Sequence, residues 1–430
     1  MSVAIHPDWR LLRNGTLFNR FTLDRFECSP RERAYLEALI KGTEPHVPSL
    51  REEFETAGVI TTQESSNSLF EEYEQASKRT DDIRINRARF VITERCNMGC
   101  PGCFVRFKYR NDEEFLNTDE ETAHTIVDEL YERNRGGNFH IHFLGGEPLV
   151  GFEIMKETIN YARGRCDGDT SCSFSVTTNA TVVTNEIAHY LNKQDVTVGV
   201  SFDGWEEIND KTRMYMSGDG TYEDAVDGYR TLQDHLDNVG ILITPQPANI
   251  DDLAAVARHL LEELEPDALT INNPFHSDGT WDIDGWKFAE KMKAIIQLCE
   301  RQRVPLVSPA TQIIGALSSQ NPKTQTLTTA DRHFTINVSP DSRLSYHIMN
   351  YDEELFPNDL GDTSTERFEK WASFSGYQNK ECQDCVALNT CGGPDPIESY
   401  HGTGHVDELE LNPDRCVFYQ EMTQWLASKL

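Results

Sequence analysis

The sequence lacks the features of a membrane or secreted protein. No apolar run approaches the roughly 18 residues that a membrane-spanning helix needs. The first residues, MSVAIHPDWRLLRNG, contain no apolar core of the kind that a signal peptide carries. We therefore expect a cytoplasmic protein without a membrane partner.

Basic residues are scarce. The 430 residues include 40 Lys and Arg against 71 Asp and Glu, which gives a formal net charge of -31. Such a chain repels nucleic-acid phosphates, so we expect no nucleic-acid partner. The acidity suits a basic partner such as a cationic peptide, but it also serves solubility or a salt-adapted host. The even spread of the acidic residues favours solubility or salt adaptation.

A disulfide framework is not expected either. The chain has 11 cysteines, an odd number, which in a cytoplasmic protein points to metal binding or catalysis. No fixed-period repeat or low-complexity tract accompanies them. Seven of the cysteines form two groups, namely Cys96, Cys100 and Cys103, then Cys382, Cys385 and Cys391 with Cys416.

The length suggests two or three domains, and the pattern divides into residues 1–85, 86–320 and 321–430. In the first region, extended segments flank a turn at Asn14-Gly15, and two helices follow, at 30–40 and 49–56. This region is similar to a small winged-helix element, and a plain N-terminal extension is the alternative. The third region is loop-rich, so we expect a metal centre to hold its shape.

The middle region alternates short apolar strands with helical patterns, which indicates βαβ units and a parallel sheet. Six such units are too few for a complete eight-stranded barrel. We therefore predict an α/β fold, a partial (β/α)6 barrel whose chemistry lies at the carboxyl ends of the strands. The predicted strands are 88–93, 140–144, 173–177, 196–201, 239–244 and 269–272.

The first cysteine group directly follows the first predicted strand. Cys96, Cys100 and Cys103 share one tight loop with small and turn-forming residues between them. Cysteine thiolates are the usual ligands of iron–sulfur clusters, and three ligands leave one iron of a cubane open. A structural zinc site or three buried cysteines are the alternatives. Zinc requires four ligands, and this loop has no fourth Cys or His.

The second predicted strand ends in Gly145-Gly146-Glu147-Pro148. Two glycines at a strand end let a ligand approach the backbone closely. A carboxylate fixed beside them can accept hydrogen bonds from an ammonium group.

With the CxxxCxxC loop after one strand and GGEP after the next, residues 86–320 resemble the radical S-adenosylmethionine (SAM) superfamily. The resemblance implies that Cys96, Cys100 and Cys103 hold a [4Fe–4S] cluster whose open iron binds SAM. It further implies that reductive cleavage of SAM yields a 5′-deoxyadenosyl radical, which removes hydrogen from the substrate. The residues implied to contact SAM are Gly145, Gly146, Glu147, Pro148, Thr178, Asn179, Ser201, Asp203 and Arg213.

Some of these residue types are also common where no cofactor binds. Asn179 and Asp203 are also ordinary turn residues, and Arg213 is also typical of a surface charge. The sequence departs from the family at Gly102, where an aromatic residue usually lies near the adenine. Either Phe104 compensates for it or the adenine rests on backbone.

The second cysteine group can close a cubane or a zinc site. It resembles the SPASM extension of radical SAM maturases, which typically holds two auxiliary clusters. Two of the expected cysteines are replaced, one by Asp395 and one by His347, and none lies between Cys299 and Cys382. We therefore expect one auxiliary [4Fe–4S] cluster, with the ligands Cys382, Cys385, Cys391 and Cys416.

The resemblance implies a peptide or protein maturase of the ribosomal natural-product type. Its partners would be a peptide substrate, with a leader peptide bound by the N-terminal region, and an electron donor such as a flavodoxin or ferredoxin. The alternatives are a sulfatase-maturase-like oxidation of Cys or Ser and a non-catalytic iron–sulfur electron carrier. No catalytic base is identified. The candidates to face the substrate are His347 and Asp395, with Asp331, His333 and Tyr346 as further ones.

Overall fold

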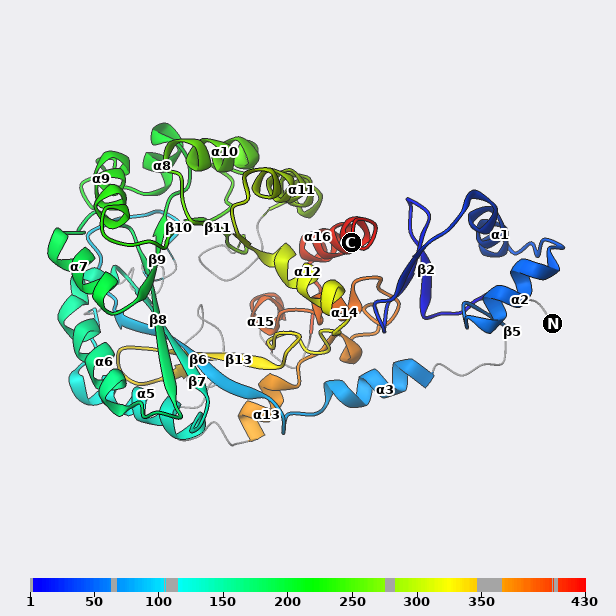
Figure 1. Cartoon of the computed structure of the whole chain (residues 1–430), viewed down its shortest axis with the longest axis horizontal. Helices are drawn as coiled ribbons and strands as arrows, with labels where there is room; N and C mark the ends of the chain where they lie inside the picture. Colours follow the sequence, from blue (N-terminus) through cyan, green and yellow to red (C-terminus); the bar gives the residue numbers. More distant parts are fainter. Residues whose placement is uncertain are drawn as a thin grey trace.

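The computed structural model describes residues 3–62, 68–103, 105, 115–274, 283–345, 366–403, 405 and 409–430. Its centre is a nine-stranded sheet with the strand order β12-β11-β10-β9-β8-β7-β6-β13-β14 (Figure 1). All neighbouring pairs are parallel except β13 and β14. The predicted α/β class is therefore confirmed, and the described strands form an open sheet and not a closed barrel.

All six predicted strands are present, and further strands extend the sheet at both edges. The strands are β6 (Arg84–Thr93), β7 (Asn138–Gly145), β8 (Ser171–Thr178), β9 (Val196–Ser201), β10 (Val239–Ile243), β11 (Ala268–Ile271), β12 (Leu306–Val307), β13 (His333–Val338) and β14 (Leu344–Ser345). The helices around them are α5 (Glu120–Arg133), η1 (Pro148–Gly151), α6 (Phe152–Arg165), α7 (Asn185–Lys193), α8 (Glu206–Thr212), α9 (Tyr222–Gln233), α10 (Leu253–Glu263), α11 (Gly285–Gln302) and α12 (Pro309–Ser319).

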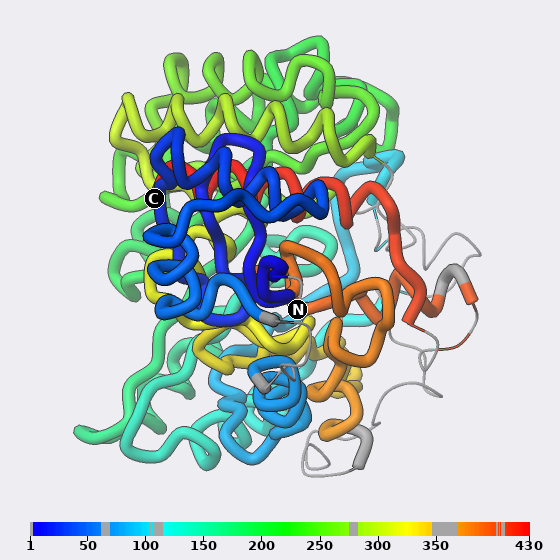
Figure 2. The backbone as a smooth tube through the Cα atoms, turned by 90° about the vertical axis from the view of Figure 1, so that its right-hand side faces the viewer, coloured from blue at the N-terminus to red at the C-terminus, as the bar shows by residue number. Residues whose placement is uncertain are grey.

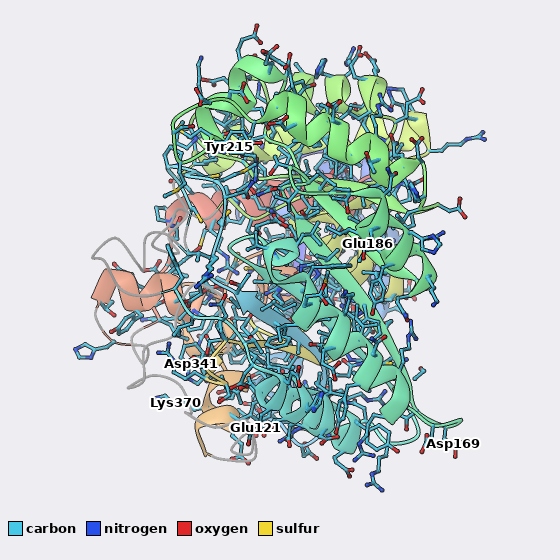
Figure 3. All side chains as sticks on the ribbon, turned by 90° about the vertical axis from the view of Figure 1, so that its left-hand side faces the viewer. Glu121, Asp169, Glu186, Tyr215, Asp341 and Lys370 are labelled. Carbon is cyan, nitrogen blue, oxygen red and sulfur yellow. The ribbon has the colours of Figure 1, made fainter. Side chains whose placement is uncertain are left out.

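The alternation of side chains along each strand separates two faces of the sheet. In β8, Phe174 and Val176 are buried, whereas the residues that alternate with them, Ser173, Ser175 and Thr177, are not. The apolar residues belong to the main core beneath the surrounding helices, because successive strand residues point to opposite faces. Figure 3 shows the outer surface, where Glu121, Asp169 and Glu186 project from the helical layer and its loops.

The N-terminal region forms a small lobe with a core of its own. Helix α1 begins after Ser29, whose side chain forms a capping box with Glu32, as the Ser-Pro signal predicts. The elements are β1 (Val3–Ile5), β2 (Trp9–Leu11), β3 (Thr16–Asn19), β4 (Arg25–Glu27), α1 (Pro30–Ile40), α2 (Pro48–Thr56), β5 (Ile60–Thr62) and α3 (Ser68–Ser77). Strands β2, β3 and β4 form one sheet, and β1 pairs with β5.

The C-terminal region is more firmly packed than its sequence suggests. Its helix α16 lies along α11, with the rings of Phe418 and Phe288 stacked at 4.7 Å, and β13 joins the central sheet beside β6. Apolar packing therefore contributes to holding this region. Its helices are α13 (Glu366–Ala372), η3 (Gly376–Gln378), α14 (Leu388–Cys391), α15 (Pro396–Thr403) and α16 (Pro413–Ala427).

The N-terminal and C-terminal regions of the chain contact each other. The buried Arg20 donates a hydrogen bond to the carbonyl of Gln383, and Asn389 donates one to the carbonyl of Arg20 at 3.0 Å. Phe21 packs on Tyr377, with ring centroids 6.4 Å apart. In Figure 2 the blue N-terminal segments lie in front of part of the red C-terminal helix and beside the orange segments. None of the described helices combines the length and the apolar character that a membrane crossing requires.

Candidate functional site

The first cysteine group lies on the loop after β6, at the carboxyl edge of the sheet. The loop is held from the far side of the site, where Gly99 donates its N–H to the carbonyl of Met214 at 2.7 Å and Met98 forms a bridge with Tyr215. All three thiols are partly buried. The loop is therefore held against the segment that follows α8.

These thiols are close enough to influence one another. Burial raises the pKa of the Cys96 thiol to about 12, and the charges of Glu147, Cys103 and Cys100 add to the effect. Burial also raises the pKa of Cys100, although Arg213 opposes this. Three neighbouring thiols beside a cation fit an iron–sulfur cluster, which they would hold as thiolates. Within the described ranges, no three His, Cys, Asp or Glu side chains converge on one mononuclear ion.

Gly145, the last residue of β7, and Gly146 after it allow a close approach of two backbone segments. A Cβ on Gly145, whose φ is +148°, would lie 2.2 Å from the carbonyl oxygen of Thr93, and one on Gly146 would lie 2.3 Å from that of Arg95. Gly146 and Glu147 donate their N–H groups to these same carbonyls, both at 2.8 Å. From the sequence, the glycines are expected to admit a ligand. In the structure they let the end of β7 rest on the chain that enters the cysteine loop.

Glu147, directly after the end of β7, accepts hydrogen bonds from residues at the end of β8. Its side chain is 1% exposed, and its Oε1 accepts hydrogen bonds from the N–H of Leu149 at 3.0 Å and the hydroxyl of Thr178 at 2.7 Å. Its Oε2 accepts the N–H of Asn179 at 2.7 Å. Burial raises the pKa of Glu147 to about 6 despite these donors. Since a carboxylate has about four acceptor positions, Oε2 retains one for a further donor.

Asn179 connects the end of β8 to the cysteine loop. Its Nδ2 donates to Oδ1 of Asn97 at 3.0 Å and lies 3.9 Å from Sγ of Cys96. The Asn97 amide in turn donates to the hydroxyl of Thr181 at 2.7 Å. Sequence reasoning found Asn179 but missed Asn97 and Thr181. The only signal for Asn97 was its position beside a predicted ligand.

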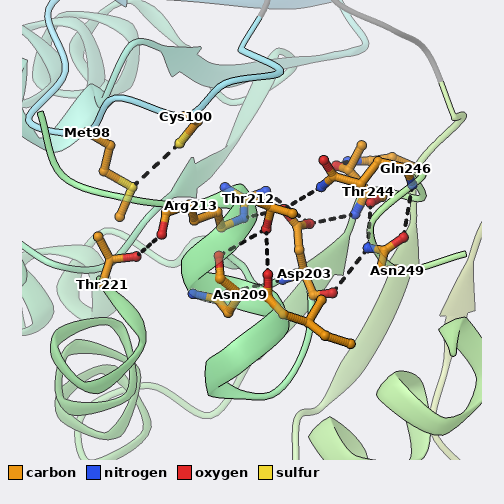
Figure 4. A network of polar contacts seen from close by, with 12 residues as sticks. Met98, Cys100, Asp203, Asn209, Thr212, Arg213, Thr221, Thr244, Gln246 and Asn249 are labelled. Atoms are coloured by element: carbon orange, nitrogen blue, oxygen red, sulfur yellow. Dashed lines mark hydrogen bonds and ion pairs between the residues drawn. The ribbon is translucent and has the colours of Figure 1, made fainter. Parts of the chain in front are cut away.

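Asp203 and Arg213 form a buried ion pair after β9 (Figure 4). Arg213 Nε lies 2.8 Å from Oδ2 of Asp203, whose other bonds come from the N–H of Thr244 at 3.1 Å and the amide of Gln246 at 3.0 Å. Burial alone would lower the pKa of Arg213, but Asp203 and then Cys100 outweigh it and raise the pKa. The cation is thus fixed beside the cysteine loop.

Gln246 was not found from the sequence, because nothing local marks it. A Cβ on Gly102 would meet only Oε1 of Gln246 within 4 Å, at 3.9 Å. No other described atom therefore lies within 4 Å of this position beside the third cysteine. Ser201, the last residue of β9, is half-buried, and Phe104 lies outside the described residues.

The second cysteine group combines Cys382 and Cys385 from the turn before α14, Cys391 at the end of α14 and Cys416 in the first turn of α16. Burial raises the pKa of Cys382, and the other three thiols of the group raise it further. The pKa of Cys416 is raised to about 12 by burial and by Cys391. Four thiols that raise one another's pKa lie close together, and such a group fits a metal centre with four protein ligands.

Buried charges surround this second group. Arg415 lies 3.5 Å from Oδ2 of Asp395 and 3.8 Å from Oε2 of Glu398. Lys323 is 6% exposed, and burial lowers its pKa to about 8. Asp395 is therefore a buried member of an ion-pair cluster.

The other predicted substrate-facing residues are dispersed. Asp331 is exposed and accepts a hydrogen bond from Asn321 at 3.1 Å. His333, on β13, contacts Asn86 at 2.9 Å. His347 and Tyr346 lie outside the described residues.

Residues 90–260 match the Radical SAM superfamily. A Methanosarcina barkeri Fe-coproporphyrin III synthase is 32% identical over 49% of this chain and 50% of its own length. A cysteine-type anaerobic sulfatase-maturating enzyme of Clostridium novyi is 29% identical over 32% of this chain and 37% of its own length. These alignments span at most half of each relative.

Two solved structures share the fold at low identity. Native anSMEcpe with bound AdoMet has a TM-score of 0.67 at 15% identity, covering 80% of this chain and 97% of that one. Streptococcus suis SuiB bound to its precursor peptide SuiA has a TM-score of 0.59 at 13% identity, covering 96% and 99%. The radical SAM match thus covers the part of the chain that carries the first cysteine group, and the two solved structures share the fold of most of the chain.

Proposed function

We propose that this chain is a radical SAM enzyme that modifies a peptide or protein substrate. The observation that carries the proposal is the meeting of three thiols, the Glu147 carboxylate and the Asp203–Arg213 pair at one edge of the sheet. An electron carrier has no need of a buried carboxylate and cation beside an open coordination site.

In this proposal Cys96, Cys100 and Cys103 ligate a [4Fe–4S] cluster. When bound, that cluster supplies the electron that cleaves SAM. The remaining acceptor position of Glu147 takes the SAM ammonium group. Arg213 faces the SAM carboxylate, while Asp203 holds the guanidinium in place. Thr178, Asn179 and Ser201, at the ends of β8 and β9, border the same pocket.

The peptide substrate is supported by the proteins that share the fold. SuiB is bound to a precursor peptide, and its structure aligns with 96% of this chain, which includes both terminal regions. The relative from Clostridium novyi is a sulfatase-maturating enzyme. We assign cross-linking, epimerisation or oxidation of a peptide as the reaction class, with the N-terminal lobe as the leader-peptide site and a cytoplasmic flavodoxin or ferredoxin as the electron donor.

The second thiol group completes the proposal as the site of one auxiliary [4Fe–4S] cluster. Cys382, Cys385, Cys391 and Cys416 supply all four ligands, so no iron of this cluster is open to substrate. Lys323 and Arg415 offset the negative charge that four thiolates bring into a buried place.

The test is anaerobic reconstitution followed by iron analysis and SAM cleavage. We expect about eight irons per chain, four per cubane, and formation of 5′-deoxyadenosine under reduction. Replacing Cys96, Cys100 and Cys103 together by Ala should leave about four irons and abolish cleavage. Cys28→Ala, outside both groups, is the matched control. Cleavage that persists in the triple variant, or zinc in the second group, would contradict the proposal.

A further inference from the structure

Residues of the N-terminal lobe hold the turn that carries the first two thiols of the second cysteine group. We call residues 382–385 the CxxC turn, because only Gln383 and Asp384 separate its two cysteines. The guanidinium group of Arg20 donates a hydrogen bond to the carbonyl of Gln383. Arg10 donates one through Nη2 to the carbonyl of Asp384 at 3.3 Å. Both residues between the cysteines are therefore bound by arginines from the other end of the chain.

Arg20 has partners on both sides of this contact. It is 1% exposed, and its Nε donates to the carbonyl of Pro7 at 3.2 Å within the lobe. Its backbone N–H donates to the carbonyl of Asp8 at 2.9 Å. In the opposite direction, its own carbonyl accepts the amide of Asn389 at 3.0 Å, two residues before a further cysteine of the group. Arg20 therefore joins the lobe to the cysteine group through both its side chain and its backbone.

Apolar packing covers the same turn. Phe21 belongs to a small buried cluster with Tyr377, Cys382 and Leu388, and this cluster is separate from the core of the lobe itself. Phe21 is fully buried there, although its chain neighbours on the N-terminal side belong to the lobe. The side chain of Cys382 is therefore covered partly by a residue of the N-terminal region, and removal of that residue would expose it to solvent.

The two arginines also place positive charge beside the CxxC turn. Burial raises the pKa of the Cys385 thiol, and Arg20 is among the groups that oppose this. Burial lowers the pKa of Arg10, and the charge of Cys385 is among those that oppose it. The Sγ of Cys385 accepts a further hydrogen bond from the amide of Gln420, on α16, at 3.5 Å. Because a cysteine binds metal as a thiolate, these neighbours favour its ligand form.

We propose that Arg20 is a positioning residue of the second cysteine group, so that docking of the N-terminal lobe and metal binding by this group stabilise each other. Partners behind a metal ligand fix its orientation, and the carbonyls that Arg20 and Arg10 bind lie between two ligands. A coupling of this kind is reciprocal, since a turn ordered by metal also offers Arg20 a fixed acceptor. That the metal is a [4Fe–4S] cluster rests on the proposed function; the coupling rests on these contacts alone.

The experiment uses the full chain in which the first cysteine group is replaced by Ala, so that metal binds to the second group. After anaerobic reconstitution, the release of iron to bathophenanthroline disulfonate is followed by absorbance. Arg20→Met keeps the unbranched stem but removes the charge and the donors, and it should release iron about tenfold faster or more. Arg20→Lys, which keeps the charge and one donor group, should slow the release again. Arg51→Met is the matched control, because Arg51 pairs with Glu44 and Glu55 inside the lobe, and it should have no effect.

A second measurement leaves the lobe unchanged, so it decides the inference even if Arg20→Met does not fold. Hydrogen exchange is compared between the metal-free and the metal-loaded form of the same chain. The amides of Arg20 and Leu23 donate to the carbonyls of Asp8 and Asn19, both at 2.9 Å. They should exchange about tenfold more slowly or less in the loaded form. The amides of α1, which packs in the lobe's own core, should exchange equally in both forms.

Three results would overturn the inference: an unchanged release rate in Arg20→Met, an equal acceleration in Arg51→Met, or equal exchange of the Arg20 and Leu23 amides in both forms. Zinc in place of iron in the second cysteine group would refute the proposed function alone, because release of that zinc to pyridylazoresorcinol tests the coupling in the same way. A chain that takes up no metal at this group would overturn both.

Discussion

Replacing Gly146 by Ala tests whether the end of β7 positions the cysteine loop. The added Cβ would lie 2.3 Å from the carbonyl oxygen of Arg95 and 2.5 Å from that of Glu94. Ordinary contact requires a retreat of about 1 Å. Such a retreat stretches the two 2.8 Å hydrogen bonds of Gly146 and Glu147 beyond the normal range. At about 1 kcal/mol for each buried bond, the local cost is about 2 kcal/mol.

The effect should be local and measurable by hydrogen exchange. A cost of about 2 kcal/mol corresponds to roughly 30-fold more frequent opening, so the amides of residues 93–97 should exchange roughly 30-fold faster. SAM binding should weaken in parallel because Cys96 follows the displaced segment. Gly164→Ala is the control, since this residue lies in α6 and an added Cβ would meet nothing within 4 Å. Normal exchange and normal SAM affinity in Gly146→Ala would refute the reasoning.

Three further predictions follow from the buried groups. Folding raises the pKa of Glu147 from 4.5 to about 6, so ionisation of this carboxyl lowers the stability of the fold as the pH rises through this interval. SAM affinity should fall as the pH drops below about 6, because the carboxylate is then protonated. A series of SAM-binding measurements at different pH should show this fall in the wild type and not in Glu147→Gln. Asp203→Asn leaves the buried Arg213 without its counter-charge, which should cost about 3–5 kcal/mol and lower the thermal unfolding temperature, whereas Asp251→Asn on the surface should leave it unchanged. Cys385→Ala should abolish peptide modification and loosen residues 321–430 while SAM cleavage continues, and peptide modification at the normal rate would show that the second cysteine group is dispensable.

Local signals made much of the fold predictable. The strand at 196–201 is apolar at alternate positions, and β9 begins and ends at these same residues. Helix α1 was predictable at both ends because Ser29-Pro30 starts it and Gly42 follows it closely. The pairing of β13 with β6 had no local signal, since the two strands are far apart in the sequence and their pairing depends on the completed sheet.

The site residues that lie close together in one short motif were predictable from the sequence. The cysteine loop was predicted from the spacing of its cysteines, and the Gly145–Glu147 turn from its place after the next strand along the chain. The pairing of Arg213 with Asp203 was not predicted, because the two residues meet only after β9 and α8 have folded. The same holds for Gln246, which follows a different strand and meets both Asp203 and the vicinity of Gly102. Contacts of this kind depend on tertiary geometry, which one sequence does not encode locally.

The contact between Arg20 and Gln383 has a consequence for how the protein is made. The two residues are separated by 363 positions along the chain. A ribosome that adds about 5–20 residues per second needs roughly 20–70 seconds to cover that interval. During this time Phe21 is without Tyr377, the aromatic ring on which it packs in the finished protein. The N-terminal segment is thus synthesised first and gains its C-terminal contacts last, and until this long loop closes, the exposed segment is open to chaperones and to aggregation.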